Sequence, residues 1–547
     1  MAMNIARYGG LVLGALGAIT GLLQGCASHA SPTTDQAEDA PATVGEALTK
    51  GSPDLDQVAI EPGPIAIDPG PIDLPCIDSA CDPSLAAAVE PSLVVLRSSG
   101  HAALLDARFN LNAVLQQLLT QAGTVGETPT ELLRRLWDPY NNLTNAHFTE
   151  SFAPHCGSTL NGYPLDCPRT GDGALANPAQ GITPANFVPV ALFNRFDLAP
   201  LDGSNCGEYR IVYWTQGTPN TGTVIFEAQM PNPHPECGIE ACRPIAEFWN
   251  GLAGLSEKAL GAQLSSFYFN GLPGFQPAIE LNNYGLGAKG GSYGTSGGQV
   301  RVNTISDGPW QLRENHLALG TNNTKGATQR LFFQPVADSN NPFGDLFNVA
   351  SSQPNAGSFQ SDFPANQVPT LASGDVNLIS MSTSGVHNAG QSTSQNGGST
   401  PDDYLQNFSL ATGNPFLTAI NGAIPTGSGL TAQDMVERAT TQSCAGCHQI
   451  SNGRPLGAGM TWPSSGTPSF GIFVHVGPAG DISEALRCVF LPHRQSVLSG
   501  FLQNCGSNPA EIIPAGCGSS GVGKSATLPA TTSTGSKSTL GGGSGVN

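Results

Sequence analysis

Basic side chains are scarce in this sequence of 547 residues, which has 22 Lys and Arg against 41 Asp and Glu and a formal net charge of −19. Binding to nucleic acid requires a basic surface that neutralises phosphates. No segment of the chain supplies one, so we expect no nucleic-acid partner. Charged residues make up only 12% of the chain and hydrophobic residues 39%. This composition is typical of folded protein, and the length allows two or three domains.

The apolar stretch near the N-terminus is too short and too rich in glycine for a good transmembrane helix. It covers residues 9–23 and follows Arg7, which predicts a signal peptide and export. It ends in Leu23-Gln24-Gly25-Cys26, which resembles the lipobox of bacterial lipoproteins. The resemblance implies that residues 1–25 are removed and that Cys26 carries a lipid anchor, with the outer membrane as the expected location. The alternative is an ordinary secretory signal with an unmodified Cys26.

One motif combines cysteine and histidine at a specific spacing, Cys444-Ala445-Gly446-Cys447-His448. Covalent attachment of haem requires two thiols, which add to the haem vinyl groups, and an adjacent imidazole that binds the iron. The motif therefore resembles the attachment site of c-type cytochromes. It implies one covalent haem c, held by Cys444 and Cys447, with His448 as an iron ligand. The alternatives are a thioredoxin-like redox pair, a zinc half-site, or two ordinary cysteines beside a histidine.

Ten of the 13 cysteines remain once Cys26, Cys444 and Cys447 are assigned. The number is even and the chain is exported, so five disulfides are possible. Sequence does not determine their connectivity. Short spacings suggest Cys76 with Cys81, Cys156 with Cys167, Cys237 with Cys242 and Cys488 with Cys505, and leave Cys206 and Cys517 as distant candidates.

The sequence predicts an α+β protein with low-complexity segments at both ends. The expected parts are the signal peptide at 1–25, a Pro/Asp-rich tether at 26–91, a mixed α/β domain of unknown function at 92–426, a small, mostly α-helical cytochrome c-like domain at 427–505, and a disordered tail at 506–547. Hydrophobic periodicity predicts helices at 111–119, 129–137, 244–249 and 256–268, and strands at 209–214, 224–228, 300–303 and 331–336. The Ser-, Gly-, Asn- and Gln-rich stretch at 351–399 reads as irregular loop.

The segment before the haem motif carries a helix start signal. Thr431 and Asp434 predict a capping box for a helix that leads into Cys444. Class I cytochromes c place a short helix in the same position, and the span 427–505 resembles such a domain in size and order of elements. A last helical portion, from Ser483 onwards, is expected to pack against this first helix.

The sixth iron ligand is less clearly indicated. In class I cytochromes c it is usually a methionine well downstream of the motif, whereas Met460, the only methionine after His448, follows it by just 12 residues. His475 is 27 residues downstream in an apolar segment able to line a haem pocket. We therefore predict His475 as the sixth ligand, with Met460 as the alternative; His493 is expected nearer the surface.

A group of charged residues lies in the predicted central domain. Arg195, Asp197, Glu208 and Arg210 form either a binding or catalytic cluster or an ion-pair network that clamps a hairpin. The surrounding segments resemble uncharacterised exported bacterial lipoproteins that end in a cytochrome-like motif, which implies no activity.

Two glycine-rich segments match the letters of nucleotide-binding motifs. The P-loop letters at 518–525 and the G-x-G-x-x-G letters at 285–290 both lack the preceding strand and following helix that phosphate binding requires. We therefore expect no nucleotide cofactor.

These features together predict a membrane-anchored, monohaem c-type cytochrome that transfers single electrons in the cell envelope to a redox partner that the sequence does not identify. One alternative is a haem-dependent oxidoreductase with a substrate site in the central domain. Another is a surface binding or assembly module with a structural haem. An electron carrier is favoured over an enzyme that converts a substrate.

Cys26→Ser should release the protein from membranes into the soluble envelope fraction, because the lipid chains are its only expected anchor. Fractionation of cells and immunoblotting would measure this. A variant that stays on membranes after a high-salt wash would contradict the lipobox assignment.

Overall fold

The computed structural model describes residues 90–140, 157–167, 169–217, 222–285, 297–304, 310–322, 328–394, 401–464 and 476–503. All of them belong to one unit of the chain. The predicted signal peptide, Cys26, nearly all of the tether, His475 and the C-terminal tail lie outside the described residues. No helix within those residues is long and apolar enough to cross a membrane.

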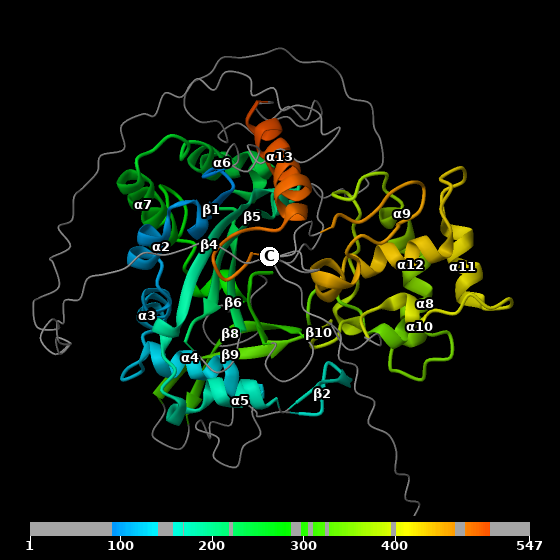
Figure 1. Cartoon of the computed structure of the whole chain (residues 1–547), viewed down its shortest axis with the longest axis horizontal. Coiled ribbons are helices and arrows are strands. Elements are labelled where there is room, and N and C mark those ends of the chain that lie inside the picture. Colours follow the sequence, from blue (N-terminus) through cyan, green and yellow to red (C-terminus); the bar gives the residue numbers. More distant parts are fainter. Residues whose placement is uncertain are drawn as a thin grey trace, which may run out of the picture. The chain divides into compact units, whose positions relative to one another are not determined.

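The largest element is an antiparallel sheet of eight strands (Figure 1), and the predicted α+β class is confirmed. The strands lie in the order β1-β4-β5-β6-β7-β8-β10, with β9 also paired to β8. Their bounds are β1 Val94–Leu96, β4 Phe187–Arg195, β5 Asn205–Thr215, β6 Gly222–Pro231, β7 Gln299–Thr304, β8 Gln311–Asn322, β9 Thr328–Val336 and β10 Ser392–Thr393; β2 Thr159–Leu160 and β3 Tyr163–Pro164 form a separate pair. The predicted hairpin is confirmed as β5 and β6, and the other two predicted strands lie in β7 and β9.

One face of the sheet is apolar because side chains alternate between the two faces of a strand. Tyr209, Ile211 and Tyr213 of β5 are fully buried on this face, within the first hydrophobic core. Helices α2 Ala102–Arg108, α3 Leu111–Ala122, α4 Pro129–Trp137 and α7 Glu257–Ser265 contribute to this core, as does α6 Arg243–Asn250 (Figure 1). The Tyr213 hydroxyl donates a hydrogen bond to the Phe109 carbonyl at 2.8 Å, which fixes the strand to the helical layer.

In this layer, helices α3 and α4 each begin directly after a residue whose side chain caps the helix. The Asn110 side chain accepts a hydrogen bond from the Ala113 amide at the start of α3, and Gly123 ends that helix in a left-handed conformation. Thr128 and Glu131 form the reciprocal capping box of α4. A short helix, α5 Thr170–Ala176, follows in the chain.

A second hydrophobic core gathers residues from Tyr163 to Trp462. Its helices are α8 Ala356–Asp362, α9 Val368–Leu371, α10 Tyr404–Asn407, α11 Pro415–Ala423 and α12 Ala432–Thr440. Aromatic rings fill its centre: Phe347 stacks on Tyr404 with centroids 4.4 Å apart, and Phe359 lies 4.9 Å from Phe347.

The prediction of irregular loop at 351–399 is therefore wrong for part of that stretch, which contains α8 and α9. Phe359, Phe363, Val368 and Leu371 are buried there at helical spacing. The polar residues between them hide this periodicity in the sequence.

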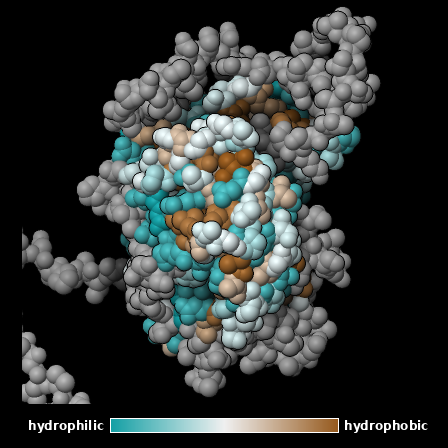
Figure 2. Space-filling model, turned by 90° about the vertical axis from the view of Figure 1, so that its right-hand side faces the viewer, coloured by the Kyte–Doolittle hydropathy of each residue, from teal (hydrophilic) through white to brown (hydrophobic). Residues whose placement is uncertain are grey.

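The outer surface near these helices is mostly polar with separate hydrophobic groups (Figure 2). The large hydrophobic side chains exposed in this part are Leu378 at 46%, Val386 at 50% and Leu410 at 53%. Single exposed residues of this kind are common on soluble proteins.

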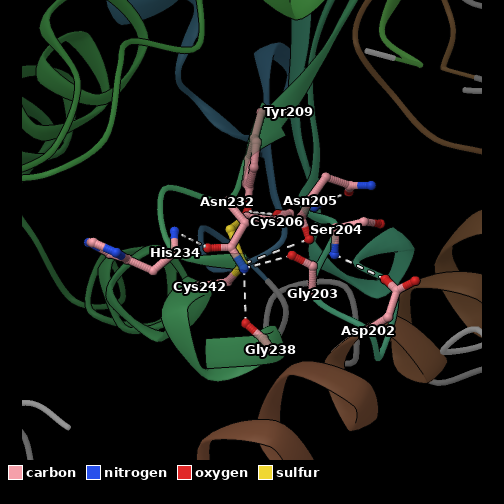
Figure 3. The surroundings of a disulfide bond; sticks show 11 residues. Asp202, Gly203, Ser204, Asn205, Cys206, Tyr209, Asn232, His234, Gly238 and Cys242 are labelled. Carbon is pink, nitrogen blue, oxygen red and sulfur yellow. Dashed lines mark hydrogen bonds between the residues drawn. A yellow bond between two sulfur atoms is a disulfide. The ribbon is translucent and has the colours of Figure 1, made fainter. Parts of the chain in front are cut away.

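The predicted pairing of Cys237 with Cys242 is wrong. Cys206 is bonded to Cys242, with Cα atoms 5.3 Å apart (Figure 3), and Cys237 belongs to another disulfide. The Asn232 side-chain amide donates to the Gly203 carbonyl at 2.7 Å and to the Gly238 carbonyl at 2.9 Å. These contacts hold two distant loops together, so the partner close in space is not the one close in sequence.

The segment at 427–505 contributes to both cores. α12 and the C-x-x-C-H motif lie in the second core, whereas Val476, Leu486, Leu491 and Leu498 lie in the first. Helix α13 Leu491–Gln503 packs mainly on α6 and on the turn Phe196–Leu198 rather than on α12. The rings of Phe196 and Phe501 are 4.8 Å apart.

Candidate functional site

The C-x-x-C-H motif follows α12 directly and is buried. The expected capping box is present: the Thr431 amide donates to the Asp434 carboxylate at 2.8 Å, and the Asp434 amide donates to the Thr431 hydroxyl at 3.2 Å. After α12 the chain forms a π-helical turn, Gly446–Ile450. Cys444, Cys447 and His448 are 2%, 3% and 5% exposed. The structure therefore brings together the three residues that the sequence assigns to haem attachment.

The two motif cysteines differ from the other cysteines of the described chain. Seven cysteines lie in the described residues, and five of them, Cys167, Cys206, Cys237, Cys242 and Cys488, form disulfides. Cys444 and Cys447 are buried thiols. The predicted partners of Cys167 and Cys488 lie outside the described residues. The motif cysteines are thus set apart from the disulfide-bonded cysteines of the described residues.

The motif is fixed to the sheet by two contacts. The His448 imidazole stacks on the Trp310 indole, with ring centroids 4.0 Å apart and planes inclined by 12°. The Ala445 amide donates a hydrogen bond to the Ser392 hydroxyl of β10 at 2.8 Å. Trp310 directly precedes β8, so side-chain alternation places it on the same face as Glu314.

That face of the sheet carries a charged ladder, which we define as Arg195, Glu208, Arg210, Glu227, Arg301 and Glu314. The register sets Arg195 opposite Glu208 on β4 and β5, Arg210 opposite Glu227 on β5 and β6, and Arg301 opposite Glu314 on β7 and β8. Glu208 is the most exposed member at 14%, and the other five side chains are at most 4% exposed. Cross-strand pairing of opposite charges allows this burial.

Glu227 joins the two halves of the ladder. One of its carboxylate oxygens lies 3.2 Å from Arg210 Nη1, and the other lies 3.3 Å from Arg301 Nε. Arg301 Nη2 is also 2.8 Å from the Glu314 carboxylate. Glu227 thus compensates two buried guanidinium groups.

The charged group expected in the central domain is part of this network. Arg195 binds Asp197 at 2.9 Å and Arg210 binds Glu208 at 2.7 Å, as the ion-pair alternative describes. Sequence reasoning missed Glu227, Arg301 and Glu314. The available signal was clearest at Glu227, a charged residue that follows the apolar run Val224–Phe226 within β6, which is unusual unless the charge is paired.

The ladder acts electrostatically on the motif. Burial raises the pKa of the Cys444 thiol well above its usual range; the Arg301 guanidinium opposes this shift, and the carboxyl groups of Asp338, Glu314 and Glu227 add to it. Cys444 is therefore a protonated thiol at neutral pH.

Two further buried carboxyl groups, Asp402 and Asp338, lie beside β10 and β8. Burial raises the pKa of Asp402 to about 7, although the Thr393 amide donates to it at 2.6 Å and Asn341 donates at 3.4 Å. Burial likewise raises the pKa of Asp338, with a contribution from Glu314.

The candidate sixth ligands have different positions. Met460 is half-buried in a turn where its amide donates to the Gly457 carbonyl at 3.0 Å and the Leu456 amide donates to its carbonyl at 2.8 Å. Arg438 of α12 donates to the Leu456 carbonyl at 2.7 Å, which holds this turn against the helix. His475 lies outside the described residues. His493, expected nearer the surface, is half-buried on α13.

A cavity of about 570 Å³ lies elsewhere on the described structure. Its lining includes Glu90, Ser99, His101 and Asp481, but none of the motif residues. Burial raises the pKa of Glu90 to about 7, and the hydrogen bond from Ser99 opposes this.

The described residues contain no group of three or more His, Cys, Asp or Glu side chains arranged to hold a metal ion. No protein-family model, curated protein or solved structure matches this chain. The residues at the motif match the needs of a covalent haem in their own chemistry: two cysteine side chains and an adjacent imidazole.

Glu227→Gln should lower the free energy of unfolding by about 3–5 kcal/mol, because two buried guanidinium groups lose their shared carboxylate. Glu208→Gln is the matched control on the same face and should cost about 1 kcal/mol, since Glu208 is more exposed and binds one arginine. Urea unfolding at neutral pH, followed by tryptophan fluorescence, measures both. Equal losses would contradict the bridging role of Glu227.

Proposed function

We propose that this protein is a lipid-anchored, monohaem c-type cytochrome that transfers single electrons in the cell envelope. Cys444 and Cys447 hold the haem, and His448 binds its iron. The observation that carries the proposal is the buried C-x-x-C-H motif itself, with both cysteines and the imidazole held at the end of a capped helix. Two cysteines beside an imidazole have the composition that haem attachment requires.

The residues around the motif have identifiable tasks under this proposal. The capped helix α12 delivers the two thiols at the start of one turn, and the Ser392 hydroxyl fixes the Ala445 amide between them. Trp310 restricts rotation of the His448 ring through its stacking contact. The bound haem would supply the change between ferric and ferrous iron, and these contacts would set the orientation of its protein ligand.

The buried ladder supports an electron-transfer role. Reduction of iron changes one unit of charge, and fixed arginines and carboxylates respond to that change with little reorganisation. Burial of the motif also keeps water away from the site, which is one of the means by which a protein adjusts a haem potential.

The proposed location rests on the lipobox letters that end in Cys26. A lipid anchor there, followed by a tether that ends near residue 91, would hold the folded part at the outer membrane. A redox partner protein would exchange electrons with this folded part.

The enzyme alternative would need a substrate cavity that reaches the motif. The cavity beside Glu90 contains none of the motif residues.

The wild-type protein should keep haem through acid–acetone extraction and denaturing electrophoresis, and peroxidase staining of the gel detects it. Cys444→Ala with Cys447→Ala should abolish the stain, because both thioether bonds are lost. Cys206→Ala with Cys242→Ala is the matched control, since it removes two cysteines and should leave the stain in place. Haem that washes out of the wild type would refute the proposal.

The sixth ligand can be assigned by substitution at three positions. We predict that His475→Ala gives a high-spin or water-bound ferric haem, because imidazole coordination is lost, whereas Met460→Leu leaves the spectrum nearly unchanged. His493→Ala is the control on α13. Visible and near-infrared spectra of the ferric protein measure the outcome.

The wild-type ferric protein should then lack the near-infrared band of thioether coordination. Loss of low-spin character in the Met460 variant alone would move the assignment to Met460, and loss in the His493 variant alone would move it to α13.

A further inference from the structure

The cavity beside Glu90 lies where three segments that are far apart in the sequence meet. Residues 90–101, residues 252–260 and residues 481–482 all contribute to its lining. Its volume of about 570 Å³ is within the range of about 300–1,000 Å³ that is usual for small-molecule sites. Apolar side chains come from each segment, among them Leu96, Leu255 and Ile482. The cavity is therefore large enough for a small organic molecule and partly apolar.

The walls of the cavity are fixed by contacts within the fold. The Ser98 hydroxyl donates a hydrogen bond to the Gly480 carbonyl at 2.7 Å. A Cβ atom on Gly480 would lie only 2.6 Å from the Arg97 Cβ, so the chain before Asp481 packs directly on the turn Arg97–Ser99. Leu252 and Leu260 are 1% and 2% exposed and belong to the first core. These contacts set the shape of the cavity, as in a largely pre-formed binding site.

The polar part of the lining carries negative charge without a matching cation. Within the described part of the chain, neither Glu90 nor Asp481 forms an ion pair. Arg97 follows the lining residue Leu96, but its guanidinium binds both carboxylate oxygens of Asp106, at 2.6 and 2.9 Å. The cavity thus presents two carboxyl groups, which favour a positively charged ligand over an anion.

Two further polar groups of the lining are hydrogen-bond acceptors or lack a partner. The Ser99 hydroxyl donates to the Glu90 carboxylate at 2.8 Å, which leaves the lone pairs of its oxygen to accept. The Nδ1 atom of His101 is buried and has no hydrogen-bond partner among the described residues. An ammonium group carries three N–H donors and no acceptor, so it matches such surroundings.

We propose that this cavity binds a small aliphatic amine, whose ammonium group pairs with the Glu90 carboxylate and whose hydrocarbon part packs on the leucine side chains. Asp481 adds negative charge to the same site. The apolar lining favours a cation that carries hydrocarbon over a hydrated metal ion, and the described residues offer no group arranged as metal ligands there. The site is separate from the proposed function, because none of the motif residues line the cavity.

Three ligands of equal chain length test the charge preference: n-hexylamine, n-hexanol and n-hexanoate, each titrated into the full protein by calorimetry at pH 8. Since the pKa of Glu90 is about 7, its carboxyl group is mainly ionised at this pH, whereas an alkylamine is still protonated. Wild type should bind hexylamine about tenfold more tightly than hexanol, and hexanoate most weakly, because the charge-assisted hydrogen bonds form only with the amine.

Substitutions then locate the site. Glu90→Gln should weaken hexylamine binding about tenfold and leave hexanol binding unchanged, because only the ion pair is lost. Glu257→Gln is the matched control: it removes an exposed carboxylate in the first turn of α7, outside the lining, and should leave both affinities unchanged. Leu255→Ala should weaken the amine and the alcohol alike, because both lose the same apolar contact.

The proposal is overturned if hexanol binds wild type as tightly as hexylamine, if none of the three ligands binds, or if Glu90→Gln behaves like Glu257→Gln. The ligand series uses wild type alone, so it decides the question even where a variant does not fold. A wild type without haem staining would refute the proposed function and leave the amine test unaffected.

Discussion

Charged side chains buried on one face of a sheet are tolerated only where each meets an opposite charge, because removing an ion from water costs several kcal/mol. In this protein the antiparallel register provides that match, with Arg210 opposite Glu227 and Arg301 opposite Glu314. A shift by one residue would move these charges to the apolar face and the tyrosines of β5 to the charged face. The ladder and the helix-covered core therefore fix the register together.

The same constraint shapes the site. The C-x-x-C-H motif lies against the charged side of the sheet, and its imidazole is stacked on Trp310, which directly precedes β8. Its helix belongs to a second core built largely from aromatic side chains, whereas α13 packs on the first core. Residues that are neighbours in the last part of the sequence thus contribute to two separate packing centres, and the motif and the ladder act on each other electrostatically.

The cysteines of the described residues fall into two groups, those in disulfides and those of the motif. Disulfides link segments such as β5 and the start of α6, where chain reversals bring two loops together. The motif thiols instead lie in a single buried turn. Burial favours the protonated thiol of Cys444, which is less nucleophilic than a thiolate.

Local patterns in the sequence determined what depends on neighbouring residues. Examples are the capping boxes at Thr128 and Thr431 and the β5–β6 hairpin, which depend on residues close together in the chain. The C-x-x-C-H spacing is likewise visible in the sequence itself. Tertiary structure alone decided that Cys206 bonds to Cys242, that Glu227 bridges two arginines, and that helices form within 351–399. Each of these depends on which distant segments meet, and a charge, a thiol or a weak helical pattern in sequence carries no information about the partner that compensates or buries it.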